Sequence, residues 1–315
     1  MAVTKTNFIN YTRCPRYIYL EQVKIAKLEK LLSLPEYQKK EQQEKLKELF
    51  NSMYETDVEG NDTDLIDIEN PQLKTMLLYY QKVEKLAGQY IEKTFPGLTI
   101  FNESTFKQKE FHFTHNNIKY QCYLDIYNEN NNEINIIEVK ATTTNKYMKL
   151  GTTAKYKERS IFYLKNNIIY VKEELDRYNI EEEFKLEDYN KYKEKLYNRY
   201  DECGKYIYDI AIQRFFVENY YKENNIVLPK INYYLAILNH QYVFDGDYKN
   251  FEPDYHADSN GNEIITLIDV SKLTKSYQDL INQDMLRLES YLDNYEKGEV
   301  SLGKHCEFKK PTQCK

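Results

Sequence analysis

Four β-rich segments follow one another between residues 98 and 142, with helical patterns on either side of them. Each is rich in Ile, Phe, Tyr or Val and is bounded by polar, Asn-containing turns, which is the pattern of strands. The segments cover 98–106, 110–115, 118–128 and 133–142. Because consecutive strands joined by short turns usually pair with each other, we predict a largely antiparallel meander over this stretch.

Helical periodicity predicts the elements around these strands. Residues 20–54 are rich in Lys, Glu and Leu with a break at Pro35, and an acidic loop up to Pro71 completes an N-terminal helical insertion at 20–70. Further helices are expected at 72–94, 206–223 and 273–295, and further strands at 231–239 and 265–271. This order favours an α/β fold with a central mixed sheet flanked by helices, and a single domain over 1–315.

Charge and hydropathy limit the functional classes. The chain has 315 residues, and 44 Lys and Arg against 50 Asp and Glu give a formal net charge of −6. It is therefore not a globally basic nucleic-acid binder, although a local basic surface is enough to bind phosphates. No apolar run approaches the roughly 20 residues that span a bilayer, and the N-terminus lacks the apolar core of a signal peptide. We expect a cytoplasmic protein that does not enter membranes.

Two adjacent strand segments carry charged side chains in apolar surroundings. Glu138 and Lys140 should point to one face, because strand side chains alternate, with Ile137 and Val139 on the other. A short turn can bring Asp125 beside Glu138. Two carboxylates this close repel each other unless a cation such as Mg²⁺ or Mn²⁺ neutralises them, and a nearby lysine can then act on a metal-bound water or on a phosphate. The competing interpretation is a solvated face with an ordinary cross-strand ion pair.

The pattern of Asp125 followed by Glu138-Val139-Lys140 resembles the D…(D/E)xK signature of PD-(D/E)XK nucleases. Within them it resembles the RecB/AddB-like superfamily, which includes the CRISPR-associated RecB-like exonucleases. The resemblance implies a restriction-endonuclease-like sheet in which Asp125 and Glu138 bind the metal with help from Glu103. It also implies that Lys140 acts on the attacking water.

The helix expected at 206–223 extends the resemblance. Its segment Asp209-Ile-Ala-Ile-Gln213-Arg-Phe-Phe216 is similar to the family's Q-x-x-Y motif, with Phe216 in place of Tyr. The likeness implies that Gln213 positions the catalytic centre, with the catalytic strands at 98–142. It is closest to bacterial proteins that fuse this module to a C-terminal RNase H-like domain, so the chain is expected to be the N-terminal module of a longer protein.

One position departs from the family's pattern. Many RecB-like nucleases place a metal-ligand His in the helix before the strands, whereas Lys85–Tyr90 holds no His and offers Gln89 as the substitute. The alternative to a metal-dependent deoxyribonuclease is therefore a catalytically degenerate nucleic-acid-binding or scaffold module on the same fold.

The five cysteines are an odd number, which argues against a disulfide framework. In the AddB-like nucleases one N-terminal and three C-terminal Cys hold an iron–sulfur cluster. The resemblance implies a [4Fe-4S] cluster on Cys14, with Cys306 and Cys314 of the C-terminal segment 300–315, and with the fourth ligand outside this chain. The alternative is that all five cysteines are unliganded thiols.

Basic residues interleaved with an aromatic residue follow the charged strand. Lys146, Lys149 and Lys155, with Tyr147 among them, suit a groove for single-stranded nucleic acid, although the same residues also suit a solvated surface. Taken together, the residues and the resemblance predict an enzyme that hydrolyses phosphodiester bonds of DNA, acting on single strands or ends.

Overall fold

The computed structural model describes residues 2–19, 22, 26, 71–101, 108–131, 133–152, 160–172 and 186–292, and only the backbone of 71–78 and 186. Apart from residues 22 and 26, the insertion expected at 20–70 lies outside these residues, as does the segment 300–315. The chain divides into two compact units: one comprises 1–78, 114–121 and 279–315, and the larger one comprises 79–113 and 122–278. The single domain expected over 1–315 stays a prediction.

The larger unit is built on a seven-stranded mixed sheet. In spatial order its strands are β2 (Leu98–Phe101), β5 (Ile126–Glu129), β6 (Glu133–Thr143), β9 (Lys230–Leu238), β12 (Ile265–Asp269), β8 (Ile168–Val171) and β7 (Phe162–Lys165). β6 and β9 are parallel, while β5 pairs with β6 and β12 pairs with β9 in antiparallel fashion. The predicted α/β fold with a central mixed sheet flanked by helices is confirmed.

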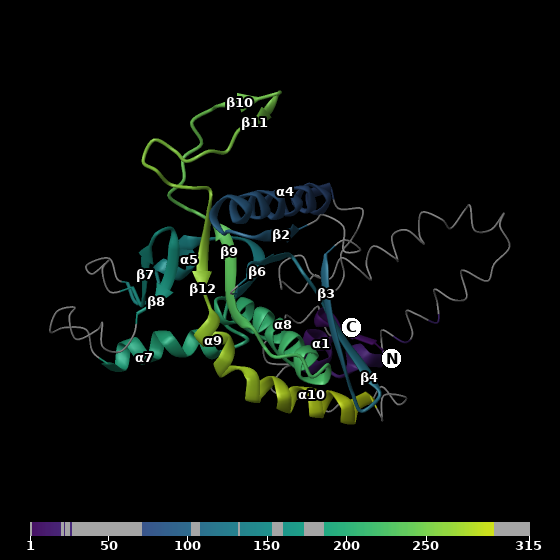
Figure 1. Ribbon diagram of the computed structural model, residues 1–315. Helices are drawn as coiled ribbons and strands as arrows, with labels where there is room; N and C mark the ends of the chain where they lie inside the picture. The colour runs from purple at the N-terminus through teal and green to yellow at the C-terminus, as the bar shows by residue number, and fades with distance from the viewer. Residues whose placement is uncertain are drawn as a thin grey trace. The chain divides into compact units, whose positions relative to one another are not determined.

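Two long helices cover the two faces of this sheet, α4 (Pro71–Thr94) and α8 (Gly204–Glu223). Ile137 and Val139 of β6 pack into a buried cluster with residues of α4 such as Ala87, and each buried Ile contributes about 1.5–3 kcal/mol to folding. Glu138 and Lys140 contact side chains of α8 on the opposite face. Figure 1 shows β6 and β9 with α4 on one side and α8 on the other.

Most of α8 is enclosed rather than half exposed. Twelve of its residues are buried, from Gly204 to Val217, and they lie all around the helix. The helix expected at 206–223 is present, but over this stretch it lacks the polar outer face of a surface helix. Asp209 and Gln213 are among the buried residues, and polar groups in such a position need internal partners.

The antiparallel meander predicted over 98–142 is wrong. The segment 118–128 is not one strand, since a bend at Asp125 divides it into β4 (Ile118–Leu124) and β5. β3 (Lys109–His115) and β4 belong to a separate three-stranded sheet with β1 (Ala2–Thr4), whereas β2 pairs with β5. The chain therefore leaves the large sheet after β2 and returns to it at Asp125.

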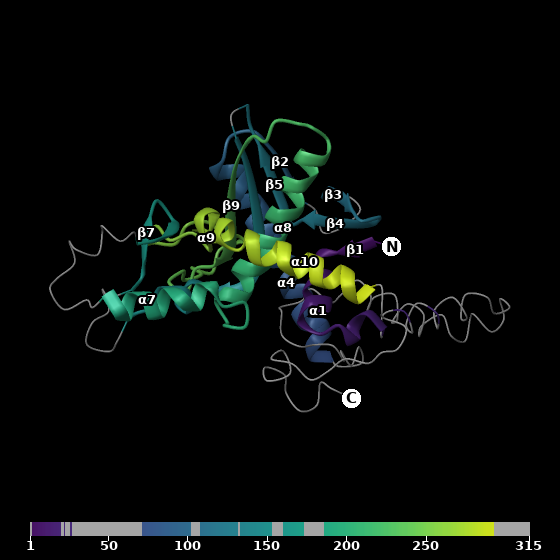
Figure 2. The same cartoon turned by 90° about the horizontal axis from the view of Figure 1, so that it is seen from below.

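The smaller unit contains β1, which is parallel to residues 119–121 of β4. α1 (Lys5–Arg13) begins where Thr4 Oγ1 accepts the N–H of Asn7 at 3.1 Å. In α10 (Gln278–Leu292) the buried carboxylate of Glu289 accepts hydrogen bonds from the Asn116 amide and the Tyr120 hydroxyl at 2.8 and 2.9 Å. Figure 2 shows β1, β4 and α10 side by side.

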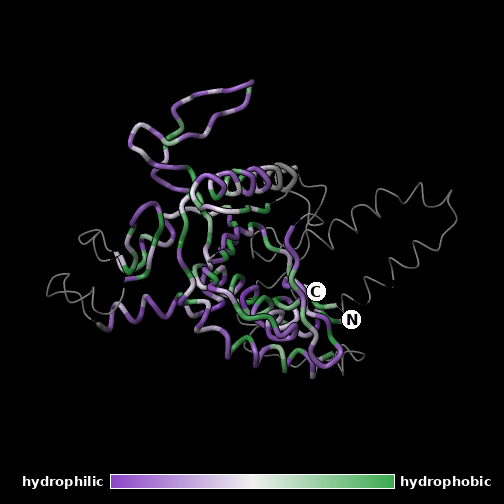
Figure 3. Tube along the Cα trace, viewed as in Figure 1, coloured by the Kyte–Doolittle hydropathy of each residue, from purple (hydrophilic) through white to green (hydrophobic). Residues whose placement is uncertain are grey.

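Shorter elements complete the described chain: α5 (Thr144–Met148), α7 (Leu186–Glu194), a 3-10 turn (Lys195–Tyr197), α9 (Ser271–Ser276), β10 (Tyr248–Lys249) and β11 (Glu252–Pro253). The helix expected at 273–295 is divided near Tyr277 into α9 and α10. β10 and β11 form a hairpin within an excursion between β9 and β12 that is predominantly hydrophilic (Figure 3). None of the described helices has both the length and the apolar character needed to cross a bilayer.

Candidate active site on the α8 face of the central sheet

β6 places Glu138 and Lys140 in the interior, facing α8. Their exposed fractions are 1% and 6%, so the pair does not lie on a solvated strand face. An ionised side chain taken out of water is costly unless an opposite charge or hydrogen bonds replace the lost solvation. The groups that contact Glu138 and Lys140 therefore indicate what chemistry these two residues can perform.

Lys140 lies between two carboxylates. Its Nζ is 2.8 Å from Glu138 Oε1 on the same strand and 2.6 Å from Asp209 Oδ2 on α8. The ring of Tyr206 is also near, with its centroid 5.7 Å from Nζ. A single ammonium group thus joins the strand to the helix and holds the two acidic groups apart.

Gln213 contacts the other oxygen of Glu138. It lies one helical turn after Asp209, and residues four apart on a helix share a face. Its Nε2 donates a hydrogen bond to Glu138 Oε2 at 2.5 Å. Its Oε1 is buried and, among the described residues, has no hydrogen-bond partner. Leaving a buried amide oxygen unpaired costs about 1–3 kcal/mol, which marks the position as one suited to a bound cation or a donor.

Asp125 lies at the bend between β4 and β5 and is partly buried. Its Oδ2 accepts the backbone N–H of Val139 at 2.8 Å, so a side chain takes the place of a backbone acceptor where the β5–β6 ladder ends. The last pair of that ladder is Ile126↔Ile137, and the next position along would pair Asp125 with Glu138. The structure thus places Asp125 against the strand that carries Glu138.

The acidic groups of this cluster outnumber the basic ones. Asp125, Glu138 and Asp209 are three carboxylates against the single ammonium of Lys140, which leaves a formal charge of −2. They do not form a compact set of three ligands, since Lys140 lies between Glu138 and Asp209. Among the described residues one such set lies within 4.8 Å, namely Asp245, Asp247 and His256 in the β10–β11 excursion. All three are exposed, and His256 Nε2 lies 2.8 Å from Asp245 Oδ2.

Several predicted residues lie elsewhere. Gln89 is exposed on α4, the helix that covers the face opposite to Glu138, so it does not replace the family's His ligand. Cys14 is buried in the smaller unit, where it ends α1. Outside the described residues lie Glu103, Lys155, Cys306 and Cys314.

The basic loop after β6 is only partly a surface. Tyr147 is fully buried and its hydroxyl donates to the carbonyl of Cys203 at 3.4 Å, so the prediction that its ring stacks on nucleic acid is wrong. Lys146 Nζ lies 3.5 Å from Glu202 and 4.9 Å from the centre of the Tyr206 ring. Lys149 is exposed. The ring of Tyr147 is buried because it packs edge to face with Phe162 of β7.

Sequence reasoning did not assign a role to Asp209. The signal was present in the spacing: Asp209 and Gln213 are the polar residues of an otherwise apolar run in α8, and they are four positions apart. Two polar residues on one face of a buried helix indicate a shared polar partner. In the structure that partner is the Glu138–Lys140 pair.

No family model, no curated protein and no solved structure matches this chain.

Proposed function

We propose that this chain is a metal-dependent nuclease that hydrolyses phosphodiester bonds of DNA, acting in the cytoplasm on single strands or ends. The observation that carries the proposal is the buried cluster in which Glu138 and Lys140 of β6 meet Asp209 and Gln213 of α8, with Asp125 beside the same strand. Buried charges are expensive, and clusters of them are found preferentially at functional sites. The resemblance of the D…ExK pattern to PD-(D/E)XK nucleases supplies the reaction class.

The donor set fits a hard divalent cation. A formal charge of −2 is what one such ion neutralises, and the available atoms are the carboxylate oxygens that Mg²⁺ and Mn²⁺ prefer. The unpaired Oε1 of Gln213 adds a neutral oxygen at the same place. Asp125 and Glu138 would hold the ion. When bound, it supplies Lewis-acid activation of a phosphoryl oxygen and of a water molecule.

The chain's own residues divide the remaining work. Lys140 carries positive charge to the site, where it stabilises negative charge that develops on the phosphate. Asp209 holds the Lys140 ammonium by an ion pair at 2.6 Å, and Gln213 fixes the carboxylate plane of Glu138. Asp209 and Gln213 are thus positioning residues that act through Lys140 and Glu138.

The test is cleavage of end-labelled single- and double-stranded DNA and RNA with Mn²⁺ or with a chelator. We expect shortening of the DNA with Mn²⁺ alone, and none by Glu138→Gln. Glu187→Gln, which makes the same change on an exposed residue of α7, is the control and should cleave like the wild type. Equal cleavage by both variants would contradict the assignment of Glu138.

A second candidate function is that of a catalytically degenerate module, which has the same fold but does not cleave nucleic acid. The ammonium of Lys140 already neutralises part of the charge of Glu138 and Asp209, as in a structural ion-pair network, and Gln89 is not at the site. On this alternative the chain binds nucleic acid or serves as a scaffold. Titration with Mn²⁺ separates the two candidates, because the nuclease should bind the ion and the degenerate module should not.

A further inference from the structure

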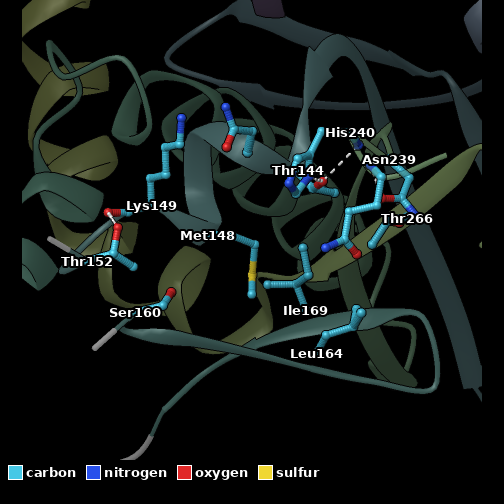
Figure 4. A pocket seen from close by; sticks show the side chains of 12 residues that line it. Thr144, Met148, Lys149, Thr152, Ser160, Leu164, Ile169, Asn239, His240 and Thr266 are labelled. Carbon is cyan, nitrogen blue, oxygen red and sulfur yellow. Dashed lines mark hydrogen bonds between the residues drawn. The ribbon is translucent and has the colours of Figure 1, made fainter. Parts of the chain in front are cut away.

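A pocket of about 610 Å³ opens in the larger unit where β6 and β9 end. Figure 4 shows Lys149, Thr152 and Ser160 on one side of it and Thr144, Asn239 and His240 on the other. Side chains of Met148, Leu164 and Ile169 line it as well and give it an apolar part. The volume lies within the 300–1,000 Å³ that is usual for small-molecule sites.

This β6–β9 pocket opens on the same face of the sheet as the candidate active site. Lys140 of β6 is the register partner of Ile237 on β9, which is the partner of Thr266 on β12. Residues in register across a sheet share a face, and Thr266 lines the pocket. Two strand spacings separate Lys140 from Thr266, or roughly 10 Å between their Cα atoms. The pocket and the cluster are therefore neighbours along one face.

The charge of the pocket differs from that of the chain. The formal net charge of the protein is −6, yet none of the described residues that line the pocket is acidic. Among the described lining residues the lysine is Lys149, which is exposed and for which no carboxylate in the described part of the chain is a partner. A site with this composition suits an anionic ligand with one charged end.

The polar groups of the pocket are arranged on both sides of its apolar part. His240 Nδ1 lies 2.6 Å from Thr144 Oγ1, and the same hydroxyl oxygen accepts the backbone N–H of His240 at 3.1 Å. These bonds hold the imidazole at the pocket wall, and Nε2 has no hydrogen-bond partner among the residues that the structure describes, so it can meet a ligand. Asn145 and Gln241 add amide groups, which can donate and accept.

We propose that the β6–β9 pocket binds one nucleotide of the nucleic-acid strand. The flat, largely apolar base lies against Met148, Leu164 and Ile169, its polar edge meets the amide groups, and its phosphate lies toward Lys149. The inference rests on the proposed function, since it deepens it: the pocket holds a nucleotide next to the bond that is cleaved. Binding to the pocket itself does not require cleavage, so the two are separable by experiment.

The first test uses thymidine 5′-monophosphate without metal. NMR of the imidazole resonances should show the His240 signal moving on addition of the nucleotide while that of His256, exposed in the β10–β11 excursion, stays in place. His240→Gln identifies the signal. Lys149→Glu should abolish the shift. No shift of His240 in the wild type, or the same shift with inorganic phosphate alone, would overturn the assignment to a nucleotide.

The second test measures binding of a fluorescent single-stranded oligonucleotide in the presence of a chelator, where no cleavage takes place. Loss of one charge-assisted phosphate contact in Lys149→Glu should weaken binding about tenfold and reduce the slope of log K against log salt by about one. Lys165→Glu is the matched control, because it makes the same charge change on exposed β7, next to Leu164 but outside the pocket.

The outcomes separate the two proposals. If Lys149→Glu and Lys165→Glu weaken oligonucleotide binding equally, the proposal that the pocket binds a nucleotide is wrong, even if the wild type cleaves DNA with Mn²⁺. Selective weakening by Lys149→Glu in a protein that does not cleave would support the pocket and count against the nuclease.

Discussion

Gln213 and Glu138, 75 positions apart in the chain, are joined by a hydrogen bond from the Gln213 amide to Glu138 Oε2. The bond connects α8 to β6 in a region where both residues are at most 1% exposed. Its geometry sets the orientation of a carboxylate that also contacts Lys140. The cluster is therefore a single polar unit whose members should respond differently to substitution.

Gln213→Leu removes the amide with little change of volume. The substitution removes the unpaired Oε1 but also the Nε2 donor of buried Glu138 Oε2, so we expect the free energy of unfolding to fall by about 1–3 kcal/mol. Affinity for Mn²⁺, measured by calorimetry, should fall. Asn219→Leu on the same helix serves as the control and should bind Mn²⁺ as the wild type does. Unchanged Mn²⁺ affinity in Gln213→Leu would remove Gln213 from the site.

Lys140→Met leaves Glu138 and Asp209 buried without their shared cation. Breaking a buried ion pair costs about 3–5 kcal/mol, and loss of a charge donor at a phosphate costs about 10²–10³-fold in rate. We expect a lower thermal midpoint that Mn²⁺ raises more in the variant than in the wild type. Lys165→Met is the exposed control. Equal increases in the wild type and in Lys140→Met would show that Lys140 does not compete with the ion for these carboxylates, and no increase in either would show that the carboxylates do not bind the ion.

Asp125→Asn and Asp125→Ala separate the two roles of this residue. The amide oxygen of Asn can still accept the N–H of Val139, so stability to urea should be nearly unchanged while Mn²⁺ affinity drops. Ala removes the acceptor as well and should cost a further 1–3 kcal/mol or so, because the buried N–H loses its partner. If Asp125→Asn binds Mn²⁺ with the affinity of the wild type, Asp125 is not a ligand of the ion.

The buried thiol of Cys203 should make the free energy of unfolding depend on pH in the alkaline range. Burial, with a smaller effect of Asp201, raises the pKa of its thiol from 9.0 to about 11. The raised pKa means that the thiol's contribution is fully present below pH 9 and is lost as pH rises through about 11. Urea unfolding across this range should therefore show a steeper decline for the wild type than for Cys203→Ala. If stability declines with pH equally in the wild type and in Cys203→Ala, the thiol does not contribute in this way.

Local patterns in the sequence predicted the elements that depend on near neighbours. Alternation along β6 was enough to place Glu138 and Lys140 on one face, and periodicity located α4 and α8 within about two residues. The strands β9 and β12 were expected at 231–239 and 265–271 and are found at Lys230–Leu238 and Ile265–Asp269.

Features that depend on distant partners were not predictable in this way. The division of 118–128 at Asp125 follows from β4 and β5 pairing in different sheets, which the segment's own apolar pattern does not encode. Burial of Tyr147 depends on contacts with Phe162 and Cys203. A charged Asp209 inside a buried helix is explained by its ion pair with Lys140, which lies on a strand far away in the chain. In each case the deciding contact is long-range.

The position of Lys140 between Glu138 and Asp209 means that this protein carries its own counterion. A site made of carboxylates alone would repel itself during folding until an ion arrived, and its assembly would depend on the supply of metal. Here the covalently attached ammonium relieves that repulsion from the start. The fold can therefore form without the proposed ion, which would then govern only the proposed activity.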